Sequence, residues 1–264
     1  MAARTRRAPA GHLILLLCGL GALLLGQAQA RSADEPVRVA VVIDDLGDHL
    51  ASGQRTVDLP GPVTCSVLPH TPHARRLAEA CHRSGKEVML HMPMQAKNGA
   101  DRGPGGVDIH MDRTAVEAAV RKDLDAVPHA RGVNNHMGSL YTRHPGNLRW
   151  VMDALRGEGD YYFVDSRTTA RSVAEQVARE AGVPATRRHV FLDHDRDPEM
   201  IRHHLERLVR HARRHGYGLA IGHPYPETLA VLEEVLPEWA RAGIKLVPAS
   251  RLVELYGQEE ENVP

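Results

Sequence analysis

The sequence places acidic, amide and imidazole side chains directly after apolar segments. The segment VRVAVVI (37–43) runs into two adjacent carboxylates, Asp44 and Asp45, and later apolar segments end in similar residues. The complete set consists of Asp44, Asp45, His91, Asn134, Asn135, His136, Asp165, Asp193, His194 and His223. Carboxylate oxygen and imidazole nitrogen together suit zinc or a similar divalent ion. The residue types therefore point to a metal-assisted reaction.

An aspartate and two histidines around a metal, with one coordination position left open, form a catalytic arrangement. A metal in such a site acidifies a bound water, which attacks a carbonyl group. A second carboxylate can take the proton from that water, and a histidine across the pocket can protonate the leaving group. The pattern thus fits a metal-assisted attack of water on a carbonyl compound.

Each of these residues also has a purely structural explanation. Two acids after a strand often form only a turn or a helix N-cap, and Asp165 before Ser166 resembles such a cap. His91 lies among apolar residues, as a hydrogen-bonded core histidine does, and NNHMGS can be a turn in which Gly138 has a positive φ angle. The joint placement of these residues favours function over the structural explanation of each one. A separate charged helical segment is interpreted as a solvated face, and it carries His203, His204, His211 and His215.

The elements that carry these residues alternate between strand and helix patterns. Short apolar segments predict strands at 37–43, 63–69, 87–93, 130–137, 161–165, 188–193, 217–223 and 244–249. Between them lie amphipathic segments whose apolar residues recur at three- and four-residue spacing. This alternation is typical of a mainly parallel sheet, either a barrel or an open doubly wound sheet. Seven or eight strands in one chain of 264 residues favour an irregular (β/α) barrel.

In both of these architectures the functional site lies at the carboxyl ends of the parallel strands. Six of the eight predicted strands end in a carboxylate, an imidazole or an amide, whereas their beginnings carry mostly Arg, Lys, Tyr and Gly. A purely structural protein gives no reason for this asymmetry. The long loop 95–112 follows the strand 87–93, and long loops in compact domains are often functional. We therefore expect one site at this edge of the sheet.

The two ends of the chain are expected to lie outside the folded domain. A basic stretch, the apolar segment 12–26 and a small-residue motif at 28–30 predict a secretory signal peptide over residues 1–30. An uncleaved N-terminal anchor is the alternative, and it is the only membrane contact that the sequence suggests. The domain then covers residues 31–256, and residues 257–264 form a disordered acidic tail. Export to the periplasm or cell envelope follows.

Charge and cysteine content restrict the class of protein further. Without the leader the chain has 30 basic and 33 acidic residues, and a net charge of −3 argues against an electrostatic nucleic-acid binder. Cys65 and Cys81 remain, on a predicted strand and the helix after it. An oxidising compartment outside the cytoplasm permits a disulfide between these two cysteines. Two buried free thiols are the alternative.

Five motifs, in this order and spacing, carry a family resemblance. VVIDDLG, LHMPM, NNHMGS, FVDSRTT and IGHPYPETL resemble the divergent polysaccharide deacetylase family, the YibQ-like branch of the NodB-type carbohydrate esterases. The resemblance covers roughly Val37 to Leu255, nearly all of the chain after the leader. It implies a deformed (β/α) barrel with the NodB-like deacetylase fold and a metal-assisted site for N- or O-deacetylation.

The resemblance also implies roles for individual residues. Asp44 resembles the general base, His223 the general acid, and Asp165 the carboxylate that orients catalytic groups. Asp45 resembles a metal ligand, with Zn²⁺ as the expected ion. The family's usual pair of histidines four residues apart is not matched, because Gln95 follows His91 at that distance.

The remaining ligands and the substrate contacts are assigned by position. His136 is expected to replace the missing histidine, so that Asp45, His91 and His136 bind the metal. Asn134, Asn135 and Ser139 are expected to hydrogen-bond the sugar. Tyr141 is the aromatic residue best placed for stacking on it.

The predicted function is that of an exported, metal-dependent carbohydrate deacetylase acting on an N- or O-acetylated envelope polysaccharide or a peptidoglycan-like glycan. The alternative is a catalytically weak or inactive glycan-binding or scaffold protein of the cell envelope with the same fold. Low aromatic content, 4% of residues, argues modestly against a sugar-binding platform.

Overall fold

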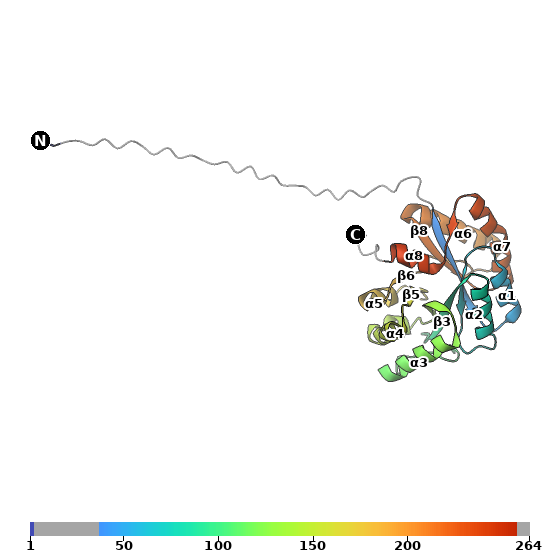
Figure 1. Ribbon diagram of the computed structural model, residues 1–264, viewed down its shortest axis with the longest axis horizontal. Coiled ribbons are helices and arrows are strands. Elements are labelled where there is room, and N and C mark those ends of the chain that lie inside the picture. The colour runs from blue at the N-terminus through green and yellow to red at the C-terminus, as the bar shows by residue number, and fades with distance from the viewer. Residues whose placement is uncertain (3–36, 258–264) are drawn as a thin grey trace. The chain divides into compact units, whose positions relative to one another are not determined.

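The computed structural model describes residues 1–2 and 37–257, and its apolar segments form one sheet of parallel strands (Figure 1). The strands are β1 (Arg38–Leu46), β2 (Thr64–Val67), β3 (Glu87–Met94), β4 (Ala130–Met137), β5 (Tyr162–Asp165), β6 (Ala185–Arg187), β7 (Val190–Phe191), β8 (Tyr217–Gly222) and β9 (Lys245–Leu246). Every predicted strand segment overlaps one of these strands. β6 was not predicted, because its three residues are too few to show a periodic pattern.

Helices connect the strands, as parallel pairing requires. They are α1 (Leu50–Asp58), α2 (Ala74–Arg83), α3 (Arg113–Ala126), α4 (Pro145–Glu158), α5 (Ala174–Glu180), α6 (Pro198–His215), α7 (Pro226–Arg241) and α8 (Ala249–Tyr256), with a 3₁₀ turn η1 (Tyr141–Arg143). The helices α1 and α8 were not among the predicted helical segments. Both are short, and α1 contains a glycine, Gly53, which lowers helix propensity.

The strand order is β6-β5-β4-β3-β2-β1-β8-β7, and β9 pairs with β1. The sheet curls into a half-barrel, so the predicted irregular (β/α) barrel is confirmed in this open form. β1 lies between β2 and β8, which brings the first and the last predicted motifs together. All strand pairs of the described sheet are parallel, so the carboxyl ends of the strands share one edge of the sheet.

Apolar packing on both faces of the sheet explains the buried strands. On one face, Val39, Val41 and Ile43 of β1 belong to the large core that the outer helices cover. On the other face, Ala40 and Val42 pack with residues of α8. The helix α8 contacts β1, β8 and β6 and so fills the concave side of the half-barrel (Figure 1). Strands buried on both faces read as continuous apolar segments, as β1 does.

A disulfide joins Cys65 of β2 to Cys81 of α2, with a Cα–Cα distance of 6.5 Å. This bond settles the choice between a disulfide and two buried thiols. It fastens α2 to the strand next to β1.

Some expectations concern residues that the structure does not describe. The predicted signal peptide over residues 1–30, apart from residues 1 and 2, and positions 258–264 of the acidic tail lie outside the described residues. Among the described helices, none combines the length and the apolar character needed to cross a lipid bilayer.

Candidate metal centre and active site

A bulge in β1 brings two adjacent carboxylates to one side of the sheet. Ile43 pairs with Cys65 and Leu46 with Val67, so two β1 residues lie opposite one residue of β2. Asp45 has a φ angle of 56°, in the left-handed region that aspartate tolerates better than most residues. Successive side chains of a regular strand point to opposite faces. The bulge removes that constraint, so Asp44 and Asp45 can both face the same histidine.

Three side chains converge where the predicted metal ligands were expected. Asp45 Oδ1 lies 2.9 Å from His136 Nδ1 and 3.1 Å from His91 Nε2. The two imidazole nitrogens lie 3.2 Å apart. Among the described residues, these three form the one group of histidine, cysteine and acidic side chains able to hold a metal together. The structure thus brings together the ligand set that the sequence suggested.

The donor set fits a divalent cation. Asp45 Oδ1 is buried, and neither imidazole is oriented for a regular hydrogen bond to it. Two histidine nitrogens and one carboxylate oxygen around one point match the ligand preferences of zinc. A cation there would satisfy an oxygen atom that is otherwise left without a partner.

The charges of the site depend strongly on one another. Burial tends to raise the pKa of Asp45, but the imidazoles of His136 and His91 outweigh it and hold this pKa well below its usual range. Burial tends to lower the pKa of His91, but Asp44 and Asp45 outweigh it and raise this pKa. The carboxylates therefore favour positive charge between them.

A buried amide sets the orientation of His91. His91 Nδ1 lies 2.8 Å from Asn134 Oδ1, which also accepts a hydrogen bond from Ser66 Oγ at 2.8 Å. Asn134 Nδ2 donates to Asp44 Oδ1 at 2.8 Å. Because an amide oxygen only accepts, the proton of neutral His91 lies on Nδ1 and its Nε2 lone pair faces the metal site.

The register of β3 and β4 explains this arrangement. His91 is paired with Asn134 and Pro93 with His136, so the two histidines come from neighbouring strands at nearly the same level. Gln95, the residue at the family's usual second-histidine position, is used elsewhere. Its side-chain oxygen accepts a hydrogen bond from Ile109 N at 3.1 Å.

His223 follows β8 directly and approaches the site from the other side of β1. Its Nδ1 lies 2.9 Å from Asp193 Oδ1, and its backbone N–H donates to Asp193 Oδ2 at 2.6 Å. Thr228 Oγ1 also donates to Asp193 Oδ2, at 2.8 Å. With Nδ1 held in this way, Nε2 lies 3.7 Å from Asp45 Oδ2. Burial tends to lower the pKa of His223, but Asp193 outweighs it and raises this pKa to about 9.

The carboxylate that holds His223 is therefore Asp193 and not Asp165, so the expectation for Asp165 needs correction. Asp165 is buried and accepts hydrogen bonds from Arg167 N at 2.8 Å and from Ser172 Oγ at 2.6 Å. These bonds fasten the segment after β5. Neither bond reaches His223 or the candidate metal ligands. The sequence placed both acids at strand ends, but it could not tell which of them would meet His223.

Three of the four predicted substrate contacts also need correction. Tyr141 is completely buried, and its hydroxyl donates to Asn147 O at 3.2 Å. Asn134 is buried between His91 and Asp44. Asn135 is buried as well and bonds to Met137 O and Ser166 N. The two amides and the tyrosine ring are buried and bond only to other parts of the protein, so a sugar cannot contact them.

Ser139, the fourth predicted contact, is only half-buried. Its Oγ accepts a hydrogen bond from Lys97 N at 3.0 Å. The hydroxyl proton remains available.

Sequence reasoning missed Arg188. This half-buried cation donates from Nε to Ser166 O at 2.7 Å and from Nη2 to Arg167 O at 2.8 Å. Burial lowers its pKa, and the charges of Asp44 and Asp165 oppose that effect. Arg188 was read as the start of a predicted strand, at the end of the sheet where no function was expected. No sequence signal distinguished it from other arginines.

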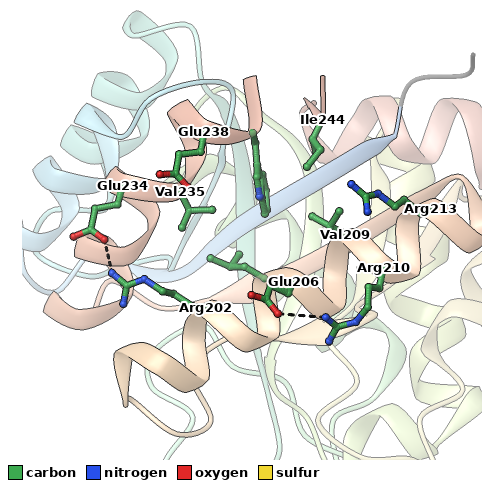
Figure 2. Close-up of a pocket in the computed structure, with 11 residues that line it drawn as sticks. Arg202, Glu206, Val209, Arg210, Arg213, Glu234, Val235, Glu238 and Ile244 are labelled. Atoms are coloured by element: carbon green, nitrogen blue, oxygen red, sulfur yellow. Dashed lines mark hydrogen bonds and ion pairs between the residues drawn. The ribbon is translucent and has the colours of Figure 1, made fainter. Parts of the chain in front are cut away.

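A separate groove of about 420 Å³ lies between α6 and α7, and Figure 2 shows its lining. Arg202 pairs with Glu234, and Arg210 pairs with Glu206 (Figure 2). None of the residues that line this groove is a histidine or a cysteine. The groove thus lacks metal ligands, and it does not compete with the site at the strand ends.

Comparison with known proteins agrees with this geometry. The chain is 36% identical to the uncharacterized protein YibQ of Escherichia coli over 216 residues, which is 82% of this chain and 67% of that protein. Among solved structures, the uncharacterized protein ATU2773 of Agrobacterium tumefaciens has a TM-score of 0.79 at 24% identity, covering 84% of this chain and 91% of that one.

A second solved structure has a similar fold. A mutant of BA3943 from Bacillus anthracis, described as a CE4 family pseudoenzyme with restored enzymatic activity, has a TM-score of 0.52 at 14% identity. It covers 83% of this chain and 68% of that one. At this identity the likeness concerns the fold alone.

The family model of the divergent polysaccharide deacetylases matches residues 41–253. That range contains the bulged acids, both histidines of the candidate metal site and His223. The chain belongs to the divergent polysaccharide deacetylase family.

Proposed function

We propose that the protein is a metal-dependent deacetylase that removes acetyl groups from an N- or O-acetylated polysaccharide of the cell envelope. The observation that carries the proposal is the convergence of Asp45, His91 and His136, with Asp44 and His223 beside them. The family is named for polysaccharide deacetylation, which supports the reaction class. The substrate and the activity of this chain are the proposed parts.

Different residues of the site have different proposed roles in hydrolysis. Asp45, His91 and His136 would hold a divalent metal, with zinc as the proposed ion. When bound, the metal supplies a Lewis acid that polarises the acetyl carbonyl and lowers the pKa of water. Asp44 Oδ2 lies 3.6 Å from His91 Nε2, so this carboxylate faces the same space.

Two proton transfers complete the proposed reaction. Asp44 accepts a proton from the attacking water, and the hydrogen bond from Asn134 holds its other oxygen in place. His223 donates a proton from Nε2 to the departing nitrogen or oxygen, while Asp193 holds Nδ1. The C–N or C–O bond of the acetyl group breaks, and acetate and a free amine or hydroxyl are formed.

Export to the envelope is proposed from two observations. The leader-like pattern over residues 1–30 predicts secretion. The disulfide between Cys65 and Cys81 supports this, because disulfides persist in oxidising compartments such as the periplasm.

The second candidate function is glycan binding without turnover. Gln95 replaces the family's usual second histidine and fastens a loop, so the ligand set differs from the common pattern. Wild-type BA3943, described as a CE4 family pseudoenzyme, has a similar fold, which supports this alternative. Under this alternative, glycan binds and no acetate is released.

One experiment separates the two functions. Zinc content of the purified protein is measured, and acetate release from N-acetylglucosamine oligomers is followed for the wild type and for Asp44→Asn. We expect bound zinc in both proteins and loss of acetate release only in the variant. Asp160→Asn, a change of an exposed acid before β5, is the matched control and should leave both quantities unchanged.

Each other result has a clear reading. Acetate release retained by Asp44→Asn would remove Asp44 from the role of base. Stoichiometric zinc and glycan binding without any acetate release by the wild type would favour the second function. Absence of bound zinc after loading would reject the proposed metal site.

A further inference from the structure

A cavity of about 260 Å³ opens beside the metal site, and we call it the loop cavity. It is lined by Asp45 and His136, by residues of the turn 68–71, and by residues 101–104 of the long loop. Because two of the proposed metal ligands line it, the cavity is the space next to the reacting acetyl group. A neighbouring sugar of a polymer would occupy it.

The wall of the loop cavity is tied to the sheet by hydrogen bonds. Val107 N donates to Pro93 O at 3.0 Å, and Gln95 N donates to Val107 O at 3.0 Å. Within the loop, Arg102 Nη2 lies 2.9 Å from Asp108 Oδ2. The loop is therefore held against the end of β3, and the cavity is formed in the absence of substrate.

A partly buried hydrogen-bonded pair adds a second point of attachment. His70, in the turn 68–71, lies with Nε2 2.8 Å from Oδ1 of Asp123 in α3. Gly105 has a φ angle of 82°, and a Cβ atom there would lie 2.3 Å from Asp123 Oδ1. The loop backbone thus packs directly against this pair, which joins both walls of the cavity.

The lining combines apolar surface with an excess of acid. Its apolar part consists of Leu68, Pro69, Pro93 and Pro104, which suit the C–H faces of a sugar ring. Its polar part includes the exposed acids Asp48 and Asp101, together with Arg102.

Arg102 does not balance these acids. Asp108 already neutralises the guanidinium group of Arg102. The Nε atom of Arg102 is buried and has no hydrogen-bond partner. The part of the cavity away from the metal ligands is therefore net negative. It accepts hydrogen bonds from hydroxyl or amine groups and repels carboxylates.

We infer that the loop cavity binds the sugar next to the acetylated one and selects neutral or amine-bearing amino-sugar polymers over glycans whose sugars carry carboxylates. This inference rests on the proposed function, because it places the acetylated sugar at Asp45, His91 and His136. It narrows the substrate class to polymers without a lactyl or uronic carboxylate beside the reacting sugar.

Equilibrium binding tests the selectivity without any need for turnover. The probes are a tetramer of N-acetylglucosamine and a tetramer of alternating N-acetylglucosamine and N-acetylmuramic acid, whose lactyl groups carry free carboxylates. Calorimetry on the zinc-loaded protein at low ionic strength should show tighter binding of the neutral tetramer, by roughly five-fold for one unfavourable charge contact. The preference should shrink at high salt.

A double variant assigns the effect to the cavity. In Asp48→Asn with Asp101→Asn, the preference for the neutral tetramer should fall close to unity, while zinc content stays the same. Asp160→Asn should keep the wild-type preference. The conservative amide replacements retain the shape of both side chains, so a folding defect is not expected, and a melting curve verifies this.

Three results would overturn the inference: equal or tighter wild-type binding of the carboxylate-bearing tetramer, an unchanged preference in the double variant, or no binding of either tetramer. Failure of the proposed function looks different. A protein that binds with the expected selectivity and releases no acetate rejects the deacetylase activity and leaves the selectivity of the cavity standing.

Discussion

Asn134 Oδ1 lies 2.8 Å from Nδ1 of His91, and both residues are buried beneath the metal site. The same amide donates to Asp44 through its nitrogen. One side chain thus holds a proposed metal ligand and the proposed base in a fixed relationship. Changes at this position should therefore affect metal binding without removing any ligand.

Replacing Asn134 with leucine should lower zinc affinity roughly 10- to 100-fold, because His91 loses the partner that fixes its orientation. The free energy of unfolding of the variant should also be lower by about 2 kcal/mol, because the His91 N–H is left buried without an acceptor. Competition with a chelator measures the affinity, and chemical denaturation of the metal-free protein measures the stability. Asn98→Ala, at an exposed amide, is the control. Unchanged zinc affinity in Asn134→Leu would contradict the role given to this amide.

Zinc itself should stabilise the folded protein. At a free zinc concentration 100 times the dissociation constant, the free energy of unfolding should rise by about 2.7 kcal/mol, because the unfolded chain lacks the assembled site. His136→Ala should lose most of this increase. Melting temperatures with and without added zinc test the effect. His110→Ala, at an exposed histidine, should respond like the wild type, and an equal response of His136→Ala would remove His136 from the ligand set.

His223 should matter more for poor leaving groups than for good ones. An amine leaving from an acetamide needs a proton, whereas an activated phenolate leaves without one. His223→Ala should therefore reduce deacetylation of N-acetylglucosamine oligomers by roughly 10²- to 10⁴-fold and hydrolysis of an aryl acetate much less. His194→Ala, an exposed neighbour of Asp193, serves as the control. Equal losses on both substrates would argue against proton donation by His223.

The disulfide should contribute substantially to stability. Cys65 and Cys81 are 16 residues apart, and closing a loop of this size stabilises a protein by about 3 kcal/mol. The double variant Cys65→Ala, Cys81→Ala should lose about that amount in chemical denaturation. Wild-type protein unfolded in the presence of a reducing agent should behave similarly. Equal stability of oxidised wild type and double variant would show that the bond adds nothing to the packed core.

The pair of His70 and Asp123 should make stability fall above neutral pH. Burial raises the pKa of Asp123 to about 8, against the opposing charge of Lys122. Burial and the charge of Lys122 lower the pKa of His70 below 6.5. In the folded protein the pair therefore holds one proton near neutral pH, on Asp123. In the unfolded chain the ordinary pKa values are 3.8 for Asp123 and 6.5 for His70. The unfolded pair therefore holds one proton only between pH 3.8 and pH 6.5.

The contribution of the pair to stability therefore falls as pH rises from 6.5 to about 8. Over that interval the free energy of unfolding should drop by about 2 kcal/mol. Asp123→Asn should remove this part of the drop, because the amide remains neutral and can still donate to His70. The part that comes from the raised pKa of His223 should remain. Denaturant unfolding at pH 6.5 and 8.5 measures the difference in the free energy of unfolding between these two pH values. Asp125→Asn, an exposed acid of the same helix, should keep the wild-type slope, and a similar slope in Asp123→Asn would contradict this assignment.

Local sequence patterns were sufficient to predict the edge of the sheet at which the candidate site lies. β1, β3, β4 and β8 were predicted with small errors at their ends, because each is six or more residues long. The short pieces β6, β7 and β9 were missed or overextended, since two or three residues carry no period. The bulge in β1 was also invisible to sequence analysis, because it depends on the register with β2.

The sequence by itself determined which residue types end the strands, and parallel topology then placed them at one edge. From this came Asp45, His91 and His136 as one cluster, with Asp44 and His223 beside it. Only the tertiary structure decided that Asp193, and not Asp165, holds His223, and that Tyr141 and Asn134 are buried. The physical reason is that strand ends follow from local periodicity, whereas partners across the sheet depend on strand order and register. β1 and β8 are neighbours in space and far apart in sequence, and no local pattern specifies that contact.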